Sequence, residues 1–267
     1  PKGGKPAACR KRQRKGSEWF RSTFVQAECL PKRTTFAETL QTAAHSAAHP
    51  VGLLRLFPRV VGHLLLRCGD FLPADFVGGL FEPSQVAVYA PDRKNAGMSD
   101  FNVVLLLHGM CCDGKDFFIR TGMADYADAA DAVLIAPSCG NNYFADGQNG
   151  LKYETYLFRE LIPFLQKTFS LNTSREKNFI LGTSMGAFAA VRLGLTYPDR
   201  FKAVCSLSAP LDLKTAVETL RDNIRDCRRR AFCSVYGSCE QFGGSSADIL
   251  HLIERTPPAT APFLWLY

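Results

Sequence analysis

The chain has 267 residues, of which 46% are hydrophobic and 21% charged, with a formal net charge of +7. This balance is typical of a globular protein and excludes a collagen, a coiled coil and a fully disordered chain. The charge is uneven, because residues 1–33 carry ten Lys or Arg against two Glu, whereas residues 34–267 have a net charge of −1. A basic tail can bind DNA or an anionic membrane surface, but this one has few interleaved aromatic residues, so nucleic acid is not the expected partner.

The first part of the chain differs in kind from the rest. We expect residues 1–80 to be a basic, poorly ordered extension and residues 81–267 to form one domain. No stretch approaches the roughly 18 apolar residues that a membrane-spanning helix needs, and the basic start leads into a polar Gly-Ser-Glu run instead of a signal-peptide core. Because the first methionine is Met98, the sequence is interpreted as a processed chain or a fragment.

Ten cysteines are scattered through the chain without a CxxC pair. They are too dilute for a disulfide scaffold and give no support to a structural zinc site. Three of them, Cys227, Cys233 and Cys239, are each six residues apart, which is the one unusual spacing among them. We therefore expect free thiols, a reducing cytoplasmic environment and no metal.

From Gln85 onward, apolar runs alternate with segments of helical period. Strands are expected at 86–90, 101–107, 132–136, 178–181, 201–207 and 263–267, and helices at 124–130, 153–169, 185–195 and 247–255. The run 101–107 is continuously apolar, as in a strand buried on both faces of a parallel sheet. The alternation predicts an α/β fold whose mostly parallel sheet is covered by helices on both faces.

The segment Gly182-Thr183-Ser184-Met185-Gly186 fits the GxSxG pattern and lies between an apolar strand and an Ala-rich helix. That context is the one a nucleophile elbow requires, although the pattern can also occur by chance in a Gly-rich loop. The turn is so sharp that side chains at positions 182 and 186 would collide with backbone, which explains the two glycines. We interpret Ser184 as a nucleophile at a helix N-terminus, where backbone N–H groups favour developing negative charge.

His108-Gly109-Met110 follows the buried strand 101–107. In α/β-hydrolases the loop after this strand donates one backbone N–H to the oxyanion hole, and the residue after the nucleophile donates another. The expected donors are therefore Met110 and Met185. His108 precedes the nucleophile, whereas the hydrolase order is serine, acid, histidine, so we expect His108 to stabilise the turn and not to act as the base.

Four segments resemble the tributyrin esterase and S-formylglutathione hydrolase (esterase D-like) family of α/β-hydrolases: LLLHGMCCDGKDF, IAPSCGNNYFADGQNG, YETYLFRELIPFL and NFILGTSMGAFAAVRLGLTYPDRF. They occur in the family's order, and the resemblance as a whole covers about residues 85–267. The resemblance implies an α/β-hydrolase fold and a serine carboxylesterase that acts on short acyl esters without a cofactor. It also implies that Ser184 is the nucleophile and that Met110 and Met185 supply the oxyanion hole. The family's glycine after GxSxG is Ala187 here.

The resemblance leaves the rest of the triad without a counterpart in this sequence. In the family the last strand leads into a loop that carries the acid, and a histidine follows, so both are expected beyond Tyr267. His251 is the only histidine after Ser184, and a solvated helix position is the alternative to a role as base. Neighbouring arginines favour a charge-paired surface over a catalytic role for three candidate acids, namely Asp212, Asp222 and Asp226. Because a serine without a base is a weak nucleophile, these 267 residues are expected to have at most trace activity.

The loop after strand 132–136 carries five polar residues: Asn141, Asn142, Tyr143, Asp146 and Gln148. It belongs at the carboxyl end of the sheet, where ligands of α/β proteins bind, so we expect Asn142 and Tyr143 to contact the substrate. A solvated loop is the alternative. The expected partner is a small-molecule ester, and the competing function is that of a catalytically inactive, hydrolase-like protein that binds another partner.

Overall fold

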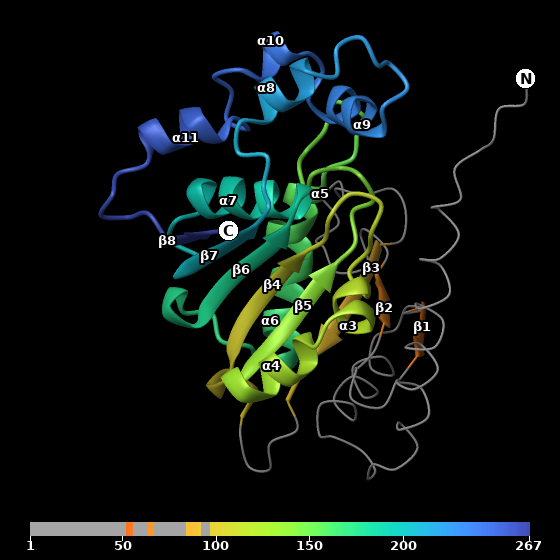
Figure 1. Ribbon diagram of the computed structural model, residues 1–267. Helices are drawn as coiled ribbons and strands as arrows, with labels where there is room; N and C mark the ends of the chain where they lie inside the picture. Colours follow the sequence, from red (N-terminus) through yellow and green to blue (C-terminus); the bar gives the residue numbers. More distant parts are fainter. Residues whose placement is uncertain (1–51, 56–62, 67–83, 92–96) are drawn as a thin grey trace, which may run out of the picture. The chain divides into compact units, whose positions relative to one another are not determined.

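The computed structural model describes residues 52–55, 63–66, 84–91 and 97–267 (Figure 1). Within these ranges eight strands form one sheet in the order β1-β2-β3-β5-β4-β6-β7-β8. Five neighbouring strands are parallel to one another: β5 (Ala132–Pro137), β4 (Asn102–Leu107), β6 (Asn178–Thr183), β7 (Ala203–Leu207) and β8 (Phe263–Leu266). β3 (Ser84–Tyr89) runs antiparallel beside β5. The mostly parallel sheet predicted from the sequence is confirmed.

Two short strands extend the sheet beyond β3. β1 (Gly52–Arg55) pairs antiparallel with β2 (His63–Leu66), and β2 pairs antiparallel with β3. Both belong to the segment 1–80 that the sequence sets apart as an extension. The remaining residues of that segment, including the whole basic tail, lie outside the described residues. The expectation that they are poorly ordered concerns residues that the structure does not describe.

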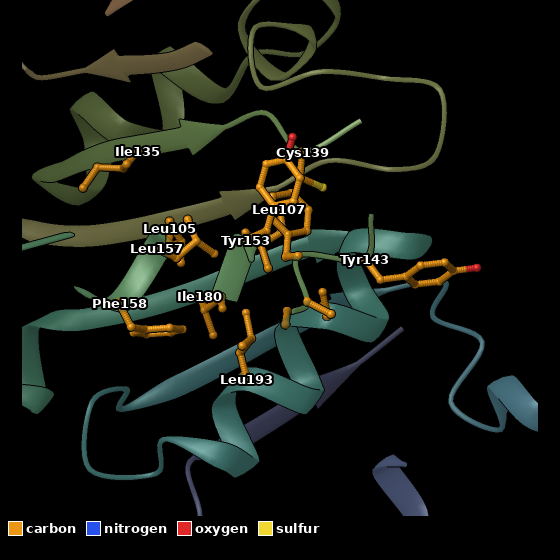
Figure 2. Close-up of a cluster of buried hydrophobic side chains, with 14 of the residues drawn as sticks. Leu105, Leu107, Ile135, Cys139, Tyr143, Tyr153, Leu157, Phe158, Ile180 and Leu193 are labelled. Carbon is orange, nitrogen blue, oxygen red and sulfur yellow. The ribbon is translucent and has the colours of Figure 1, made fainter. Parts of the chain in front are cut away.

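Successive side chains of each strand point to opposite faces of the sheet. The sheet therefore has a separate hydrophobic core on each face. Val86 and Leu105 belong to the larger core, which α5 (Tyr153–Thr155), α6 (Ile162–Phe169) and α7 (Met185–Thr196) cover; part of this core is drawn in Figure 2. Ala87 and Leu106 belong to the smaller core under α3 (Asp116–Arg120) and α4 (Met123–Ala130). The helices therefore cover both faces, as the alternation of strand and helix predicts.

The helix predicted at 153–169 is continuous but not uniform. A π-helical segment, Tyr156–Leu161, joins α5 to α6. Pro163, the second residue of α6, has no N–H to donate to the carbonyl four residues before it. The wider π-turn ahead of Pro163 accommodates that missing bond within one helical rod.

Four helices lie between β7 and β8 in the chain; the first three lie beyond the carboxyl ends of the strands, and the fourth packs beside α7 (Figure 1). They are α8 (Leu213–Glu218), α9 (Cys227–Tyr236), α10 (Cys239–Phe242) and α11 (Ile249–Arg255). Each begins at a side chain that accepts a backbone N–H of the first turn, and the four caps are Asp212, Asp226, Ser238 and Asp248. Only α11 corresponds to a helix predicted as an element from the sequence.

Three absences hold for the described part of the chain. None of its helices combines the length and the hydrophobicity that crossing a bilayer requires. It contains no group of three or more His, Cys, Asp or Glu side chains arranged to hold a metal ion. Its seven cysteines are all free thiols.

Candidate active site

Ser184 lies in the single-residue turn between β6 and α7. Its backbone has φ 51° and ψ −113°, in the left-handed half of conformational space that L-residues rarely adopt. The Ser184 N–H donates to the carbonyl of Leu207 at 2.8 Å, which ties the turn to the end of β7. The side chain is exposed, whereas the helix that follows is almost entirely buried. The strained turn thus presents the hydroxyl at the carboxyl end of the sheet.

Gly182 and Gly186 make this turn possible. A Cβ at Gly182 would lie 2.1 Å from the carbonyl oxygen of Gly186, and a Cβ at Gly186 would lie 2.0 Å from the carbonyl oxygen of Leu107. No side chain fits at such distances from backbone atoms. The steric role predicted for both glycines is confirmed.

The loop after β4 passes directly beside the serine. A Cβ at Gly109 would lie 3.7 Å from the Cβ of Ser184, which places the two residues in ordinary van der Waals contact. Met110 is the next residue of the loop. Met185 is the first residue of α7, and its N–H has no partner within the helix. The expected oxyanion donors therefore come from the two segments that flank Ser184.

A cavity of about 340 Å³ opens at Ser184. It brings together four residues singled out from the sequence, which are Met110, Tyr143, Ser184 and Met185. The rest of its wall comes from the segment that runs from the end of β7 to α9, and comprises Ser208, Ala209, Pro210, Leu213, Ala216, Val217, Leu220 and Arg228. Most of this wall is apolar, and Arg228 is its one charged side chain among the described residues.

His108 is buried, and both of its ring nitrogens are engaged. Nδ1 lies 2.7 Å from the carbonyl oxygen of Gly109, and Nε2 accepts the N–H of Cys139 at 3.0 Å. Burial lowers the pKa of the imidazole, which favours the neutral ring with its proton on Nδ1. His108 thus joins the loop after β4 to the loop after β5, and it has no ring nitrogen left for a proton from Ser184.

Asn141 makes a second link between the same two loops. Its side-chain oxygen accepts the N–H of Cys111 at 2.8 Å. Cys111 has φ 61°, so this hydrogen bond supports a strained residue next to Met110. Together, His108 and Asn141 fix the loop that carries Met110 on both sides.

Asn142 and Tyr143, which we expected to act together on the substrate, face different cavities. Asn142 is buried, donates to the carbonyl of Ala145 at 2.9 Å and accepts from Asn149 at 2.7 Å. It lines a second, larger cavity, whereas Tyr143 lines the one at Ser184. Figure 2 shows the ring of Tyr143 extending away from the core residues drawn around Cys139. Burial raises the pKa of Tyr143, so its phenol is a hydrogen-bond donor at neutral pH.

A buried ion pair holds the loop that carries Tyr143. Arg192 of α7 is only 3% exposed and is paired with Glu154 of α5. Its other terminal nitrogen donates to the carbonyl of Phe144 at 3.0 Å. Tyr143 and Phe144 both have positive φ, at 54° and 51°, and this contact stabilises that conformation.

The sequence matches the family described as "Putative esterase" over residues 80–251. The chain belongs to this esterase family. It is 26% identical over 175 residues to an acetyl esterase of Caldicellulosiruptor saccharolyticus, and the alignment covers 62% of this chain. The chain spans 64% of the length of that relative. The resemblance to esterases inferred from the sequence is confirmed.

Solved structures establish the fold of this esterase-family chain. Fluorophosphonate-binding serine hydrolase F of Staphylococcus aureus superposes with a TM-score of 0.62 at 21% identity, over 70% of this chain and 74% of that one. An S-formylglutathione hydrolase of Agrobacterium tumefaciens has a TM-score of 0.62 at 18% identity, over 81% of this chain and 78% of that one. At these identities the likeness concerns the fold, which is that of the α/β-hydrolases.

Among the described residues that line the Ser184 cavity there is no histidine and no carboxylate. His251 lies on α11, where its Nε2 is 3.4 Å from a terminal nitrogen of Arg255. Asp212 and Asp226 cap α8 and α9, and Asp222 is exposed in the turn between those helices. The charge-paired surface expected around these aspartates is present at Asp226, which binds Arg228.

The other polar residues of the loop after β5 join the loop to neighbouring helices. Asp146 accepts the N–H of Thr155 at 3.0 Å and its hydroxyl at 2.6 Å. Gln148 donates to the carbonyl of Tyr236 at 3.5 Å. Two features of the site were not predicted from the sequence. One is the cavity wall formed by α8, and the other is the ion pair between Arg192 and Glu154. The apolar spacing of Leu213, Ala216, Val217 and Leu220 is the one signal that could have indicated a helix face there.

Proposed function

We propose that this chain carries the nucleophile, the oxyanion hole and the acyl pocket of a serine carboxylic-ester hydrolase. The observation that carries the proposal is the strained turn at Ser184, which opens into a cavity bounded by Met110 and Met185. A φ of 51° at a serine is costly, and such strain is characteristically retained at functional sites. Membership of the esterase family supports the same chemistry.

In the proposed reaction the hydroxyl oxygen of Ser184 attacks the carbonyl carbon of the ester, and the hydroxyl proton passes to a base. The N–H groups of Met110 and Met185 stabilise the negative carbonyl oxygen of the tetrahedral intermediate. When this intermediate collapses, the bond to the alcohol breaks, the alcohol leaves with a proton and the acyl group stays on Ser184. Water then hydrolyses the acyl-serine to a carboxylic acid and free serine, with no cofactor.

The apolar wall supports a short acyl group as the substrate. Leu213, Ala216, Val217 and Leu220 line one side of the cavity and offer no hydrogen bond to a polar acyl chain. The volume of about 340 Å³ is at the lower end of the range for small-molecule sites. A short apolar acyl group fits this wall and volume.

We further propose that the acid and the histidine of the triad follow Tyr267 in the chain. The described lining of the cavity has neither group, so a base must come from elsewhere. The N–H of Ser208 donates to the carbonyl of Tyr267 at 2.7 Å, and Ser208 itself lines the cavity. The backbone that leaves β8 therefore begins at the rim of the site.

The test is the hydrolysis of p-nitrophenyl acetate by residues 1–267, combined with mass spectrometry after an acid quench. With an oxyanion hole but no base, the expected rate is about 10³ to 10⁴ above that of buffer. An acetyl group should be trapped on Ser184 and absent from the Ser184→Ala variant. Ser246→Ala, at an exposed position outside the cavity, is the matched control.

The possible results separate the two parts of the proposal. No acetyl group on Ser184 would contradict the hydrolase and favour an inactive protein that binds a partner. Fast turnover that requires Ser184 would support the hydrolase but contradict a base beyond Tyr267, because these residues alone would then activate the serine.

A further inference from the structure

The second cavity has the composition of a binding site for an anion. It measures about 840 Å³ and is lined by Cys139, Gly140, Asn141, Asn142, Asn149, Leu151, Tyr153, Cys227, Arg229, Arg230, Ala231, Cys233, Ser234 and Val235. The lining includes two arginines and several amide or hydroxyl groups, and none of these described residues is an Asp or Glu. Its volume is typical of small-molecule sites.

The three consecutive arginines at the start of α9 differ in their partners. Arg228 is neutralised by Asp226, which accepts from its Nε at 3.0 Å and from a terminal nitrogen at 2.7 Å. Arg229 and Arg230 form no ion pair with any carboxylate of the described residues. Their positive charges are therefore available to a ligand, and a guanidinium binds carboxylate or phosphate oxygens by paired hydrogen bonds.

The two cavities are lined by neighbouring residues of the same two segments. On the loop after β5, Asn141 lines the larger cavity, while Tyr143 lines the cavity at Ser184. On α9, Arg229 lines the larger cavity and Arg228 the smaller one. The hydrogen bond from Cys111 to Asn141 also joins the rim of the larger cavity to the residue that follows Met110. A ligand that spans this boundary would have its scissile bond near Ser184.

We propose that the larger cavity binds an oxyanion on the alcohol part of the ester, held by Arg229 and Arg230. The acyl group occupies the apolar cavity and the anionic alcohol occupies the basic one. Of this inference, the assignment of the anion to the alcohol part of an ester and the position of the scissile bond rest on the proposed esterase function. The binding of the anion is independent of catalysis.

The experiment compares three acetyl esters that differ only in the group opposite the ester. They are 4-acetoxybenzoate, 4-acetoxyphenyl phosphate and the neutral methyl 4-acetoxybenzoate. Their association constants are measured by calorimetric or NMR titration with the Ser184→Ala variant, which cannot be acylated at residue 184. We expect each anionic ester, or the one whose oxyanion fits the site, to bind about tenfold more tightly than the neutral ester, as one charge-assisted pair would provide.

Two further variants in the Ser184→Ala background locate the effect. Arg229→Ala combined with Arg230→Ala should reduce the ratio of anionic to neutral association constants to about one. Arg225→Ala, which removes an exposed arginine that lines neither cavity, should leave that ratio unchanged. Between the two anionic probes, the tighter one identifies carboxylate or phosphate as the natural group.

Several results would overturn the inference. A ratio near one in the parent variant means that the cavity does not select anions. A ratio that survives the double substitution means that other groups select the anion. An equal loss in Arg225→Ala means that only the overall positive field of this region acts. Anion binding without any acylation of wild-type Ser184 would instead reject the proposed hydrolase, and with it the ester as ligand, but would support the anion site itself.

Discussion

The side-chain oxygen of Asn141 accepts the backbone N–H of Cys111 at 2.8 Å, across a sequence separation of 30 residues. This bond holds the residue that follows Met110, an expected oxyanion donor, in a positive-φ conformation. An oxyanion hole works because its donors are oriented before the charge develops. We therefore expect Asn141 to act on the proposed chemistry through Met110, as a positioning residue.

Replacing Asn141 with leucine should lower kcat for p-nitrophenyl acetate with little change in KM. Removal of an oxyanion donor typically costs about 10²- to 10³-fold, and a misdirected donor should cost at least about tenfold. The steady-state kinetics of Asn141→Leu and of Asn223→Leu, at an exposed position in the turn before α9, check this. Equal losses in the two variants, or a change confined to KM, would reject the positioning role.

Gly186→Ala should destabilise the fold, because the new methyl group would lie 2.0 Å from the carbonyl oxygen of Leu107. Overpacking typically costs about 1 to 3 kcal/mol of the free energy of unfolding, and a clash with backbone should lie at the upper end. Gly97→Ala is the matched control: Gly97 has φ −75°, and the nearest atoms would be 3.5 Å from its Cβ. Urea denaturation should find a change within about 0.5 kcal/mol for the control. A similar cost at both sites would contradict the steric account of the elbow.

Arg192→Met should also be severe, since it leaves Glu154 largely buried without its partner and the carbonyl of Phe144 without its donor. Breaking a buried ion pair from one side costs about 3 to 5 kcal/mol. Arg120→Met removes an arginine whose side chain is 71% exposed and paired with Asp116, and should cost less than about 1 kcal/mol. The free energies of unfolding of both variants are measured by urea titration. Small and equal costs in the two variants would argue against a structural role for Arg192.

The stability of the protein should decrease as the pH falls below about 6.5, the ordinary pKa of histidine. The pKa of His108 is lowered by burial in the folded state, so the unfolded chain takes up the proton first. The contribution is complete above the unfolded pKa and is lost as the pH falls toward the folded one, with a slope of at most about 1.4 kcal/mol per pH unit.

The measurement is the free energy of unfolding between pH 8 and pH 5 for the wild type and for His108→Gln. This window excludes aspartates such as Asp226, whose lowered pKa makes them titrate at more acidic pH. The wild type should lose more stability over the window than the variant. Identical pH dependence in the two proteins would mean that His108 is not the group responsible.

The parts of the site that depend on neighbouring residues could be predicted from the sequence. The apolar strand before Gly182, the helix after it and the glycine spacing all act within a dozen residues, and together they define the turn at Ser184. The parallel sheet was predictable for the same reason, because each strand carries its own apolar pattern.

Other features depend on contacts between distant segments or on single backbone angles. Arg192 and Glu154 are 38 residues apart, and neither has a local pattern that indicates burial. Because Asn142 and Tyr143 are adjacent in the sequence, both were predicted to contact the substrate. In the structure Tyr143 has φ 54°, and the two residues line different cavities. Such an angle at a non-glycine residue is sustained by tertiary contacts and has no signature in composition.

The most direct test of the central claim, that Ser184 is the nucleophile of this fold, is to map the site of reaction with a fluorophosphonate. The chain is incubated with the reagent, digested and sequenced by mass spectrometry, beside the Ser184→Ala variant. We predict a single phosphonylated residue, Ser184, formed slowly by residues 1–267 and absent from the variant. Modification spread over exposed serines and tyrosines, or none at all in the folded protein, would contradict the assignment of Ser184.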